Sequence, residues 1–305
     1  MPIFRHRLRL TCLVAALAPT VALLPACEES APSTPTQTVS VSTDTPRVAA
    51  LLPFAADQLI ALGVKPVLVP ALRSGQPEAW QGITAGGLDH AAGPNIEQLI
   101  AADPDLVIVS AVESRHIPQI EKTTGARVIA MDADTLEDVR THTRTLGELI
   151  GKQAEAEEWI QDFNTDLSGE STPSSADEPF SVLAIFGTPN GFYAFMPHSY
   201  LGNLVEHAGG QLITEDMTEH RRFRGLATLS MEVVIDRDPD VLLVIFHGPE
   251  ESAKAMLDAD PLWGQLSATK GDHVAFLSDD LYAMRSGSQA TVALEELRAA
   301  LESAR

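Results

Sequence analysis

The sequence contains very little cysteine, with two residues in 305, at positions 12 and 27. Cys12 lies in an N-terminal segment that we expect to be removed, which leaves Cys27 alone in the mature chain. A single cysteine forms no disulfide within the chain and no thiolate metal site. Disulfide scaffolds and zinc–thiolate proteins are therefore excluded.

Basic residues are also scarce, since 21 Lys+Arg face 42 Asp+Glu and the formal net charge is −21. Nucleic-acid binding needs a broad basic surface, so this balance argues against a nucleic-acid partner. The histidines are scattered, which argues against a zinc or manganese site of the protein's own.

Motifs of enzymes are missing as well. There is no P-loop, no HExxH and no G-x-S-x-G elbow. Ser267-x-x-Lys270 matches one element of acyl-serine enzymes, but their SDN and KTG motifs are absent. We therefore predict that the protein is not an enzyme.

One apolar segment, TCLVAALAPTVALL, follows three arginines at the N-terminus and ends in LPAC, residues 24–27. This pattern predicts a secretory signal over residues 1–26, too short to span a membrane. The ending resembles the lipobox of bacterial lipoproteins, which implies export and a lipid on Cys27 that anchors the protein to the membrane. Residues 27–46 are rich in Ser, Thr and Pro and predict a flexible tether.

Two segments of the chain read almost alike, NIEQLIAADPDLVIV (95–109) and SMEVVIDRDPDVLLV (230–244). Each predicts a helix that ends at Asp-Pro and then a strand buried on both faces. Further strands are predicted at 47–54, 127–133, 181–187 and 273–278. Alternating helices and strands indicate an α/β protein with two lobes, 47–134 and 180–305, built on mostly parallel sheets.

The segment between the lobes, residues 135–167, carries its apolar residues on one helical stripe, with Thr135 as a plausible N-cap. It predicts one long, rigid α-helix of roughly 50 Å, followed by a surface loop at 168–179. Two lobes joined in this way leave a cleft that suits a ligand.

Five segments carry a resemblance to a known family, in this chain order: RVAALLPFAADQLIALGV, the first repeat, SYLGNLVEHAGG, the second repeat and DPLWGQLSATKGDHVAFL. They resemble the periplasmic substrate-binding proteins of ABC importers for ferric siderophores, haem and cobalamin. ESRH (113–116), EESAKAMLDADPLW (250–263) and YAMRSG (282–287) look like the ferric-dicitrate and siderophore branch. The resemblance implies a monomer that captures a ferric chelate and delivers it to a permease dimer with a cytoplasmic ATPase. It also implies that Glu97 and Glu232 dock on the permease.

The stretch TEHRRFRG (218–225) gathers three arginines and a histidine in an acidic chain. Guanidinium groups bind carboxylates with charge-assisted, often bidentate hydrogen bonds, as an anionic ferric chelate requires. In an extended loop, alternate side chains point to the same side, so Arg222 and Arg224 can face the ligand together. They are therefore preferred over Arg221 as ligand-binding residues. The expected ligand-binding residues are Arg115, His116, Arg222, Arg224, Tyr282 and Arg285.

Several alternatives stay open at this point. A second interpretation of the stretch is a solvated surface loop whose arginines pair with nearby acids such as Glu219. Haem would need an axial His or Tyr, for which His116, His198, His220, His247, Tyr193, Tyr200 and Tyr282 are available. Cobalamin would favour an aromatic pocket, whereas aromatic residues make up 5% of the chain. A lipid-anchored sensor is a further alternative.

Overall fold

The computed structural model describes residues 45–72, 75–86, 88–89, 93–168, 179–188, 191–221, 223–246, 249–279, 281–282, 285, 287 and 289–304. The predicted signal, Cys27, most of the tether and most of the 168–179 loop lie outside the described residues. Within the described ranges, no helix combines the length and apolar character needed to cross a membrane.

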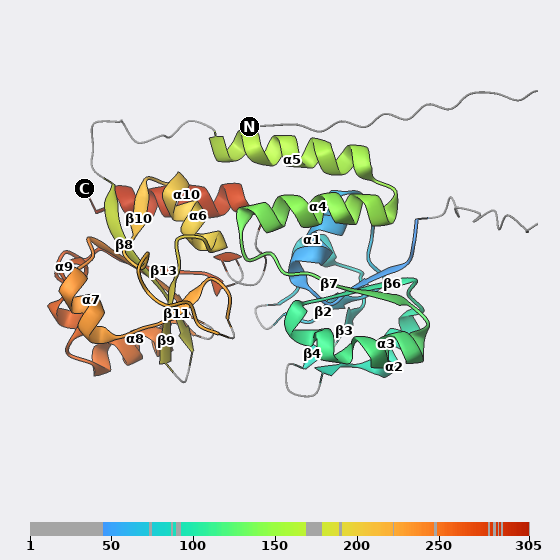
Figure 1. Cartoon of the computed structure of the whole chain (residues 1–305), viewed down its shortest axis with the longest axis horizontal. Coiled ribbons are helices and arrows are strands. Elements are labelled where there is room, and N and C mark those ends of the chain that lie inside the picture. The colour runs from blue at the N-terminus through green and yellow to red at the C-terminus, as the bar shows by residue number, and fades with distance from the viewer. Residues whose placement is uncertain are drawn as a thin grey trace, which may run out of the picture. The chain divides into compact units, whose positions relative to one another are not determined.

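The N-terminal lobe is built on a parallel sheet of order β1-β6-β7 (Figure 1). Side chains alternate across it: Val48 and Ala50 face α1, while Ala49 and Val107 face α2 and α3. The elements are β1 Val48–Ala50, α1 Pro53–Ala61, β2 Val69–Pro70, η1 Glu78–Trp80, β3 Ala85–Gly86, β4 Leu88–Asp89, β5 Gly93–Pro94, α2 Ile96–Ala102, β6 Leu106–Val109, η2 Ala111–His116, α3 Ile117–Thr124 and β7 Arg127–Ala130.

The C-terminal lobe holds a sheet of order β11-β9-β8-β12-β13, with β10 paired to the start of β8. Strands β8, β10, β12 and β13 are parallel, and β9 runs antiparallel to both of its neighbours, β8 and β11. Helices α6 and α10 cover one face and α7, α8 and α9 the other (Figure 1). The elements are β8 Phe180–Thr188, β9 Gly191–Phe195, α6 Tyr200–His207, β10 Gly210–Leu212, β11 Leu226–Thr228, α7 Met231–Arg237, β12 Val241–Phe246, α8 Glu250–Ala259, η3 Trp263–Gln265, α9 Ser267–Lys270, β13 Val274–Leu277 and α10 Ala290–Glu302. The α/β prediction with parallel-rich sheets is confirmed.

The aspartates shared by the two sequence repeats have the same structural roles in both lobes. Asp103 and Asp238 end helices α2 and α7 in the left-handed conformation, with φ of 46° and 40°. Asp105 accepts a hydrogen bond from the Arg47 N–H (2.8 Å), directly before β1. Asp240 accepts one from the N–H of Ser181 (2.9 Å) in β8. The repeat thus fixes the first strand of each lobe.

The prediction of one long helix over 135–167 is wrong, because the segment forms two helices, α4 (Leu136–Ile150) and α5 (Gln153–Ser168). Thr135 is the N-cap of α4, as expected, and accepts a hydrogen bond from the Asp138 N–H. Gly151 ends α4 with a φ of 70°, a left-handed conformation that favours glycine.

The two helices form an antiparallel hairpin (Figure 1). Arg144 binds Glu157 across it at 2.6 Å, and the Arg140 Nε donates to Asn164 at 2.7 Å. Apolar residues on one stripe fit either a single helix or two helices that turn the same face inward. The periodicity alone therefore did not reveal the reversal at Gly151.

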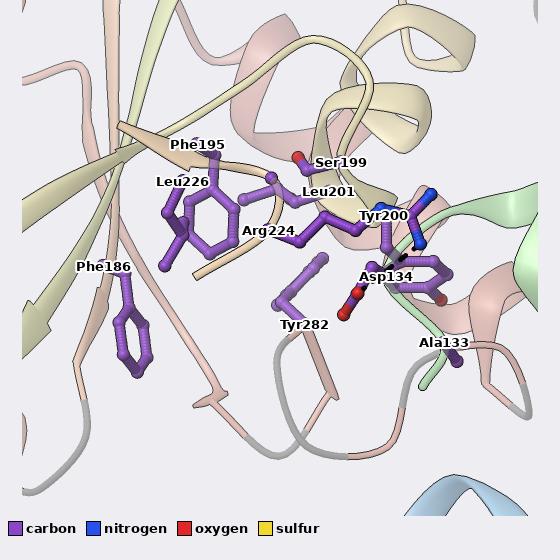
Figure 2. A pocket seen from close by; sticks show the side chains of 11 residues that line it. Ala133, Asp134, Phe186, Phe195, Ser199, Tyr200, Leu201, Arg224, Leu226 and Tyr282 are labelled. Atoms are coloured by element: carbon purple, nitrogen blue, oxygen red, sulfur yellow. Dashed lines mark ion pairs between the residues drawn. The ribbon is translucent and has the colours of Figure 1, made fainter. Parts of the chain in front are cut away.

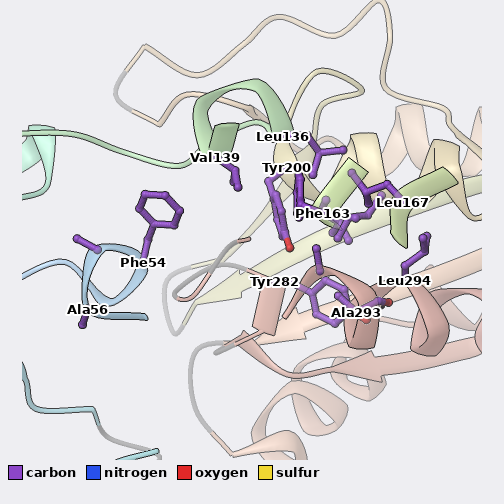
Figure 3. Packing of buried hydrophobic residues seen from close by; sticks show 14 of the residues in the cluster. Phe54, Ala56, Leu136, Val139, Phe163, Leu167, Tyr200, Tyr282, Ala293 and Leu294 are labelled. Atoms are coloured by element: carbon purple, nitrogen blue, oxygen red, sulfur yellow. Dashed lines mark hydrogen bonds between the residues drawn. The ribbon is translucent and has the colours of Figure 1, made fainter. Parts of the chain in front are cut away.

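The hairpin links the lobes through a shared hydrophobic core. The largest buried cluster contains side chains of α1, α4, α5, α6 and α10, among them Phe54, Val139, Phe163, Tyr200 and Leu294 (Figure 3). Removing such a continuous apolar surface from water stabilises both lobes together.

Replacing Gly151 with alanine tests the hairpin. A left-handed alanine costs about 1–2 kcal/mol, so the free energy of unfolding should fall by about that amount in chemical denaturation. In a continuous helix the same change would instead raise stability by about 1 kcal/mol, and such a rise would contradict the hairpin. Gly264→Ala is the matched control, because Gly264 has no positive φ and open space around its Cα.

Candidate functional site

A cavity of about 140 Å³ lies at the edge of the C-terminal lobe, where β9, β11 and α6 meet the chain that leads into α4. Phe186 and Phe195 lie on one side of it, and the ion pair between Arg224 and Asp134 lies beside Tyr200 on the other (Figure 2). The lining consists of Ala133, Asp134, Phe186, Phe195, Ser199, Tyr200, Leu201, Arg224, Gly225, Leu226 and Tyr282.

The side chain of Glu219 holds together the two ends of the stretch TEHRRFRG. One oxygen of Glu219 accepts the Gly225 N–H at 2.6 Å and lies 2.9 Å from the His198 Nε2. The Gly225 N–H, and after it His198, hold the pKa of Glu219 below its usual value. The His220 N–H donates to the Leu226 carbonyl at 2.6 Å. Glu219 therefore shapes the loop rather than only balancing its arginines.

Arg224 binds carboxylates at the start of α4. Its Nη1 lies 3.1 Å from Asp138 and 3.7 Å from Asp134. Burial, followed by repulsion from Asp132, raises the pKa of Asp134 to about 6. Burial also raises the pKa of Asp132. As the pH falls through about 6, Asp134 takes up a proton and its ion pair with Arg224 weakens.

Arg285 binds the N-terminal lobe rather than the cavity. Its guanidinium makes two hydrogen bonds to the buried Asp57, at 2.8 and 3.0 Å, and lies 5.6 Å from the ring centre of Trp80. The Trp80 Nε1–H donates to the same carboxylate at 2.8 Å.

Arg115 and His116 lie at the carboxyl end of β6 in η2. The Arg115 Nε donates to the His116 ring at 2.9 Å, and the buried Glu113 is 3.8 Å from Arg115 and 3.4 Å from His116. The His116 ring packs over Gly93, where a Cβ would meet it at 2.6 Å.

Tyr282 lines the cavity with its ring. Its hydroxyl lies 2.7 Å from the Glu296 carboxylate and 2.9 Å from the Ala293 carbonyl, both in α10. Burial and the hydrogen bond to Glu296 raise the pKa of this hydroxyl far above its usual range. The hydroxyl is thus engaged with α10.

Of the six residues expected to bind ligand, Arg224 and Tyr282 line the same cavity, whereas Arg115, His116 and Arg285 make the contacts given above. Arg222 lies outside the described residues. Each described arginine of this set lies near a carboxylate, so the structure does not assemble them into one basic cluster. With twice as many acidic as basic residues in the chain, each of these three arginines has a carboxylate close by.

Sequence reasoning missed an aromatic cluster formed by Tyr193, His220 and Phe223. The His220 and Phe223 rings are stacked, 4.9 Å apart and 16° from parallel, and Tyr193 meets both edge-on at 5.4 and 5.5 Å. Tyr193 is the cross-strand neighbour of Phe186, which lines the cavity. The low aromatic content of the whole chain hid this local concentration, which FYAF (192–195) and HRRF (220–223) already contain.

In the part of the chain that the structure describes, no three or more His, Cys, Asp and Glu side chains are grouped so that they could hold a metal ion. These residues therefore form no group that could hold a metal ion by protein ligands alone.

Residues 48–281 match the family model described as "Periplasmic binding protein". The chain belongs to this family. The curated "High-affinity heme uptake system protein IsdE" of Staphylococcus aureus is 23% identical over 209 residues, which cover 67% of this chain and 70% of IsdE.

Several solved structures share the fold of this chain. The structure of S. aureus IsdE complexed with heme gives a TM-score of 0.71 at 21% identity and covers 84% of this chain and 98% of that one. An ABC transporter substrate-binding protein from Listeria monocytogenes EGD-e gives 0.72 at 21% identity, with 85% and 99% covered. S. aureus SirA complexed with staphyloferrin B gives 0.68 at 18%, with 85% and 94% covered.

Members of the periplasmic binding protein family bind small molecules and deliver them to ABC permeases, so this periplasmic binding protein is not an enzyme. Glu97 and Glu232 occupy equivalent places in it, in the first turns of α2 and α7. Both side chains are exposed, and neither makes a hydrogen bond or ion pair to another described residue.

Proposed function

We propose that this periplasmic binding protein captures haem and delivers it to an ABC permease. The observation that carries the proposal is the aromatic cluster of Tyr193, His220 and Phe223, which continues through Phe186 to the cavity. At about 140 Å³ the cavity admits only an edge of a porphyrin, so the flat face of the ring would lie on the cluster. A porphyrin is flat and apolar over most of its surface, and aromatic side chains pack well against such a face.

The cluster also contains the side-chain types that hold haem iron. Histidine and tyrosine are both axial ligands of haem in proteins, and His220 and Tyr193 lie side by side in the cluster. One axial ligand is sufficient, because the four porphyrin nitrogens already surround the iron. Haem binding therefore does not need a group of three metal-ligating side chains.

Arg224 borders the cavity and suits the propionates of haem. A guanidinium binds a carboxylate through charge-assisted hydrogen bonds, so a propionate would exchange with Asp134 or Asp138. Burial disfavours the charged form of Asp134 and raises its pKa, so this carboxylate competes less well than a propionate for Arg224. The similarity to IsdE, a haem uptake protein by name, supports the same ligand.

A second candidate is a ferric chelate of the siderophore or dicitrate type. Arg224 favours it, with Arg222 two residues earlier in the chain, and SirA with its bound staphyloferrin B has a similar fold. The acidic neighbours of Arg224 oppose a highly charged anion, which places this candidate second.

The proposal also includes a lipid on Cys27, a flexible tether over 27–46 and docking on the permease through Glu97 and Glu232.

Titration of the soluble body (residues 28–305) with hemin tests the ligand. We expect saturable binding with a shift of the haem absorption band. Loss of the axial ligand should weaken hemin binding by about tenfold or more and change the haem absorption band. His220→Ala has this effect when His220 is the axial ligand, and Tyr193→Phe has it when Tyr193 is.

His207→Ala is the matched control, because His207 is an exposed histidine at the end of α6, away from the cluster. Ferric citrate and a ferric hydroxamate are titrated in parallel. Tight binding of either chelate without binding of hemin would reject haem and favour the second candidate.

A further inference from the structure

A second cavity, of about 340 Å³, lies in the C-terminal lobe and shares no lining residue with the first. It runs beside β13, which is the end strand of the described sheet. Its floor is apolar and comes from β12, β13, α8 and η3, through Leu242, Leu257, Trp263, Val274 and Phe276. A cavity of this size with two aromatic rings accepts a small ring or short apolar chain.

The rim of the cavity is acidic. Asp258 at the end of α8 and Asp272 in the turn after α9 are both exposed, and neither carboxylate binds another described side chain. A third acid, Asp260, accepts a hydrogen bond from the Leu262 N–H. Three carboxylates around an apolar floor give the cavity a negative potential.

One cation, Lys254, also lines the cavity, but Glu250 already neutralises it at 2.5 Å. The same ammonium lies 4.9 Å from the centre of the Phe276 ring. The cavity therefore already places a cation on one of its aromatic faces, as the ring quadrupole favours.

We propose that this second cavity binds an amphipathic organic cation, namely an aromatic ring or short apolar chain that carries a primary amine or guanidinium. The apolar part packs against Trp263 on the cavity floor, beside the Phe276 ring that Lys254 already covers, and the cationic end pairs with Asp258 and Asp272. This site does not depend on the identity of the transported ligand, since it uses none of the residues around Arg224.

Three probes with the same ring and different charge test the proposal on the full-length chain: phenethylamine, phenylacetate and phenethyl alcohol. Binding is followed by calorimetry and by the tryptophan emission, to which Trp263 contributes together with Trp80 and Trp159. We expect phenethylamine to bind at least tenfold more tightly than the other two, and more weakly as salt increases. Equal binding of the three, or no saturable binding of the amine up to about 10 mM, would overturn the proposal.

The double variant Asp258→Asn/Asp272→Asn should weaken phenethylamine binding at least tenfold. The control, Glu215→Gln/Asp236→Asn, removes the same charge from exposed positions outside the cavity and should stay within twofold. If both variants lose affinity equally, net charge rather than this cavity attracts the amine, and the site is rejected. If neither loses affinity, the amine binds elsewhere.

Discussion

Replacing Arg285 with alanine is expected to lower the free energy of unfolding by about 3–5 kcal/mol, because it leaves the buried charge of Asp57 without its cation. Both side chains are removed from solvent, with exposed fractions of 13% for Arg285 and 5% for Asp57. In a chain of this size such a loss lowers the melting temperature by roughly 6–20 °C. Thermal and chemical denaturation measure both quantities.

Two controls separate the buried pair from charge in general. Arg144→Ala breaks the exposed pair with Glu157, which water and salt screen, and should change stability far less than Arg285→Ala. The double variant Asp57→Asn/Arg285→Met removes both charges, keeps an acceptor for Trp80, and should recover most of the lost stability. If Arg285→Ala is no more harmful than Arg144→Ala, the pair does not hold the lobes together.

The position of this pair explains why its loss should affect both lobes. Arg285 lies between β13 and α10 of the C-terminal lobe, and Asp57 lies on α1 of the N-terminal lobe. Close by, a Cβ at Gly287 would meet Val139 of α4 at 2.8 Å and Phe54 of α1 at 3.4 Å. Arg285 and Gly287 thus lie against α1, and Gly287 also lies against α4, which favours small lobe movements on ligand binding.

Local sequence patterns predicted the α/β units well, because their causes are local. The Asp-Pro pairs end α2 and α7, and the apolar runs that follow form β6 and β12. The bridging helix was mispredicted because one apolar stripe fits two different backbones, and only the left-handed Gly151 distinguishes them.

The candidate site was less predictable, because its contacts join distant parts of the chain. Arg224 and Asp138 are 86 residues apart, and Arg285 and Asp57 are 228 apart. No periodicity links such pairs. A search for short runs that combine histidine with aromatic residues would have found His220 and Phe223, but not their contact with Tyr193.

Replacing both Glu97 and Glu232 with alanine is expected to abolish ligand uptake and leave ligand affinity unchanged. Among the matched repeat positions, Asp105 and Asp240 have internal partners, whereas the two glutamates are exposed and have none among the described residues. Their effect on helix stability through the dipole is only about 0.3–1 kcal/mol each. A partner with one cationic contact for each lobe accounts for a carboxylate at the same place in both.

The size of the effect follows from the strength of such contacts. A charged hydrogen bond contributes about 1.5–3 kcal/mol, so each single variant should weaken permease binding by roughly 10–150-fold and the double variant by the product. Uptake is measured in cells and affinity on the soluble body, with Glu121→Ala/Glu206→Ala as an equally charged control on exposed helix positions. Normal uptake by the double variant would place docking elsewhere, and lower ligand affinity would place these glutamates in the ligand site. If arginines on the permease are the partners, Glu97→Lys/Glu232→Lys should regain uptake only with a permease in which those arginines are replaced by glutamate.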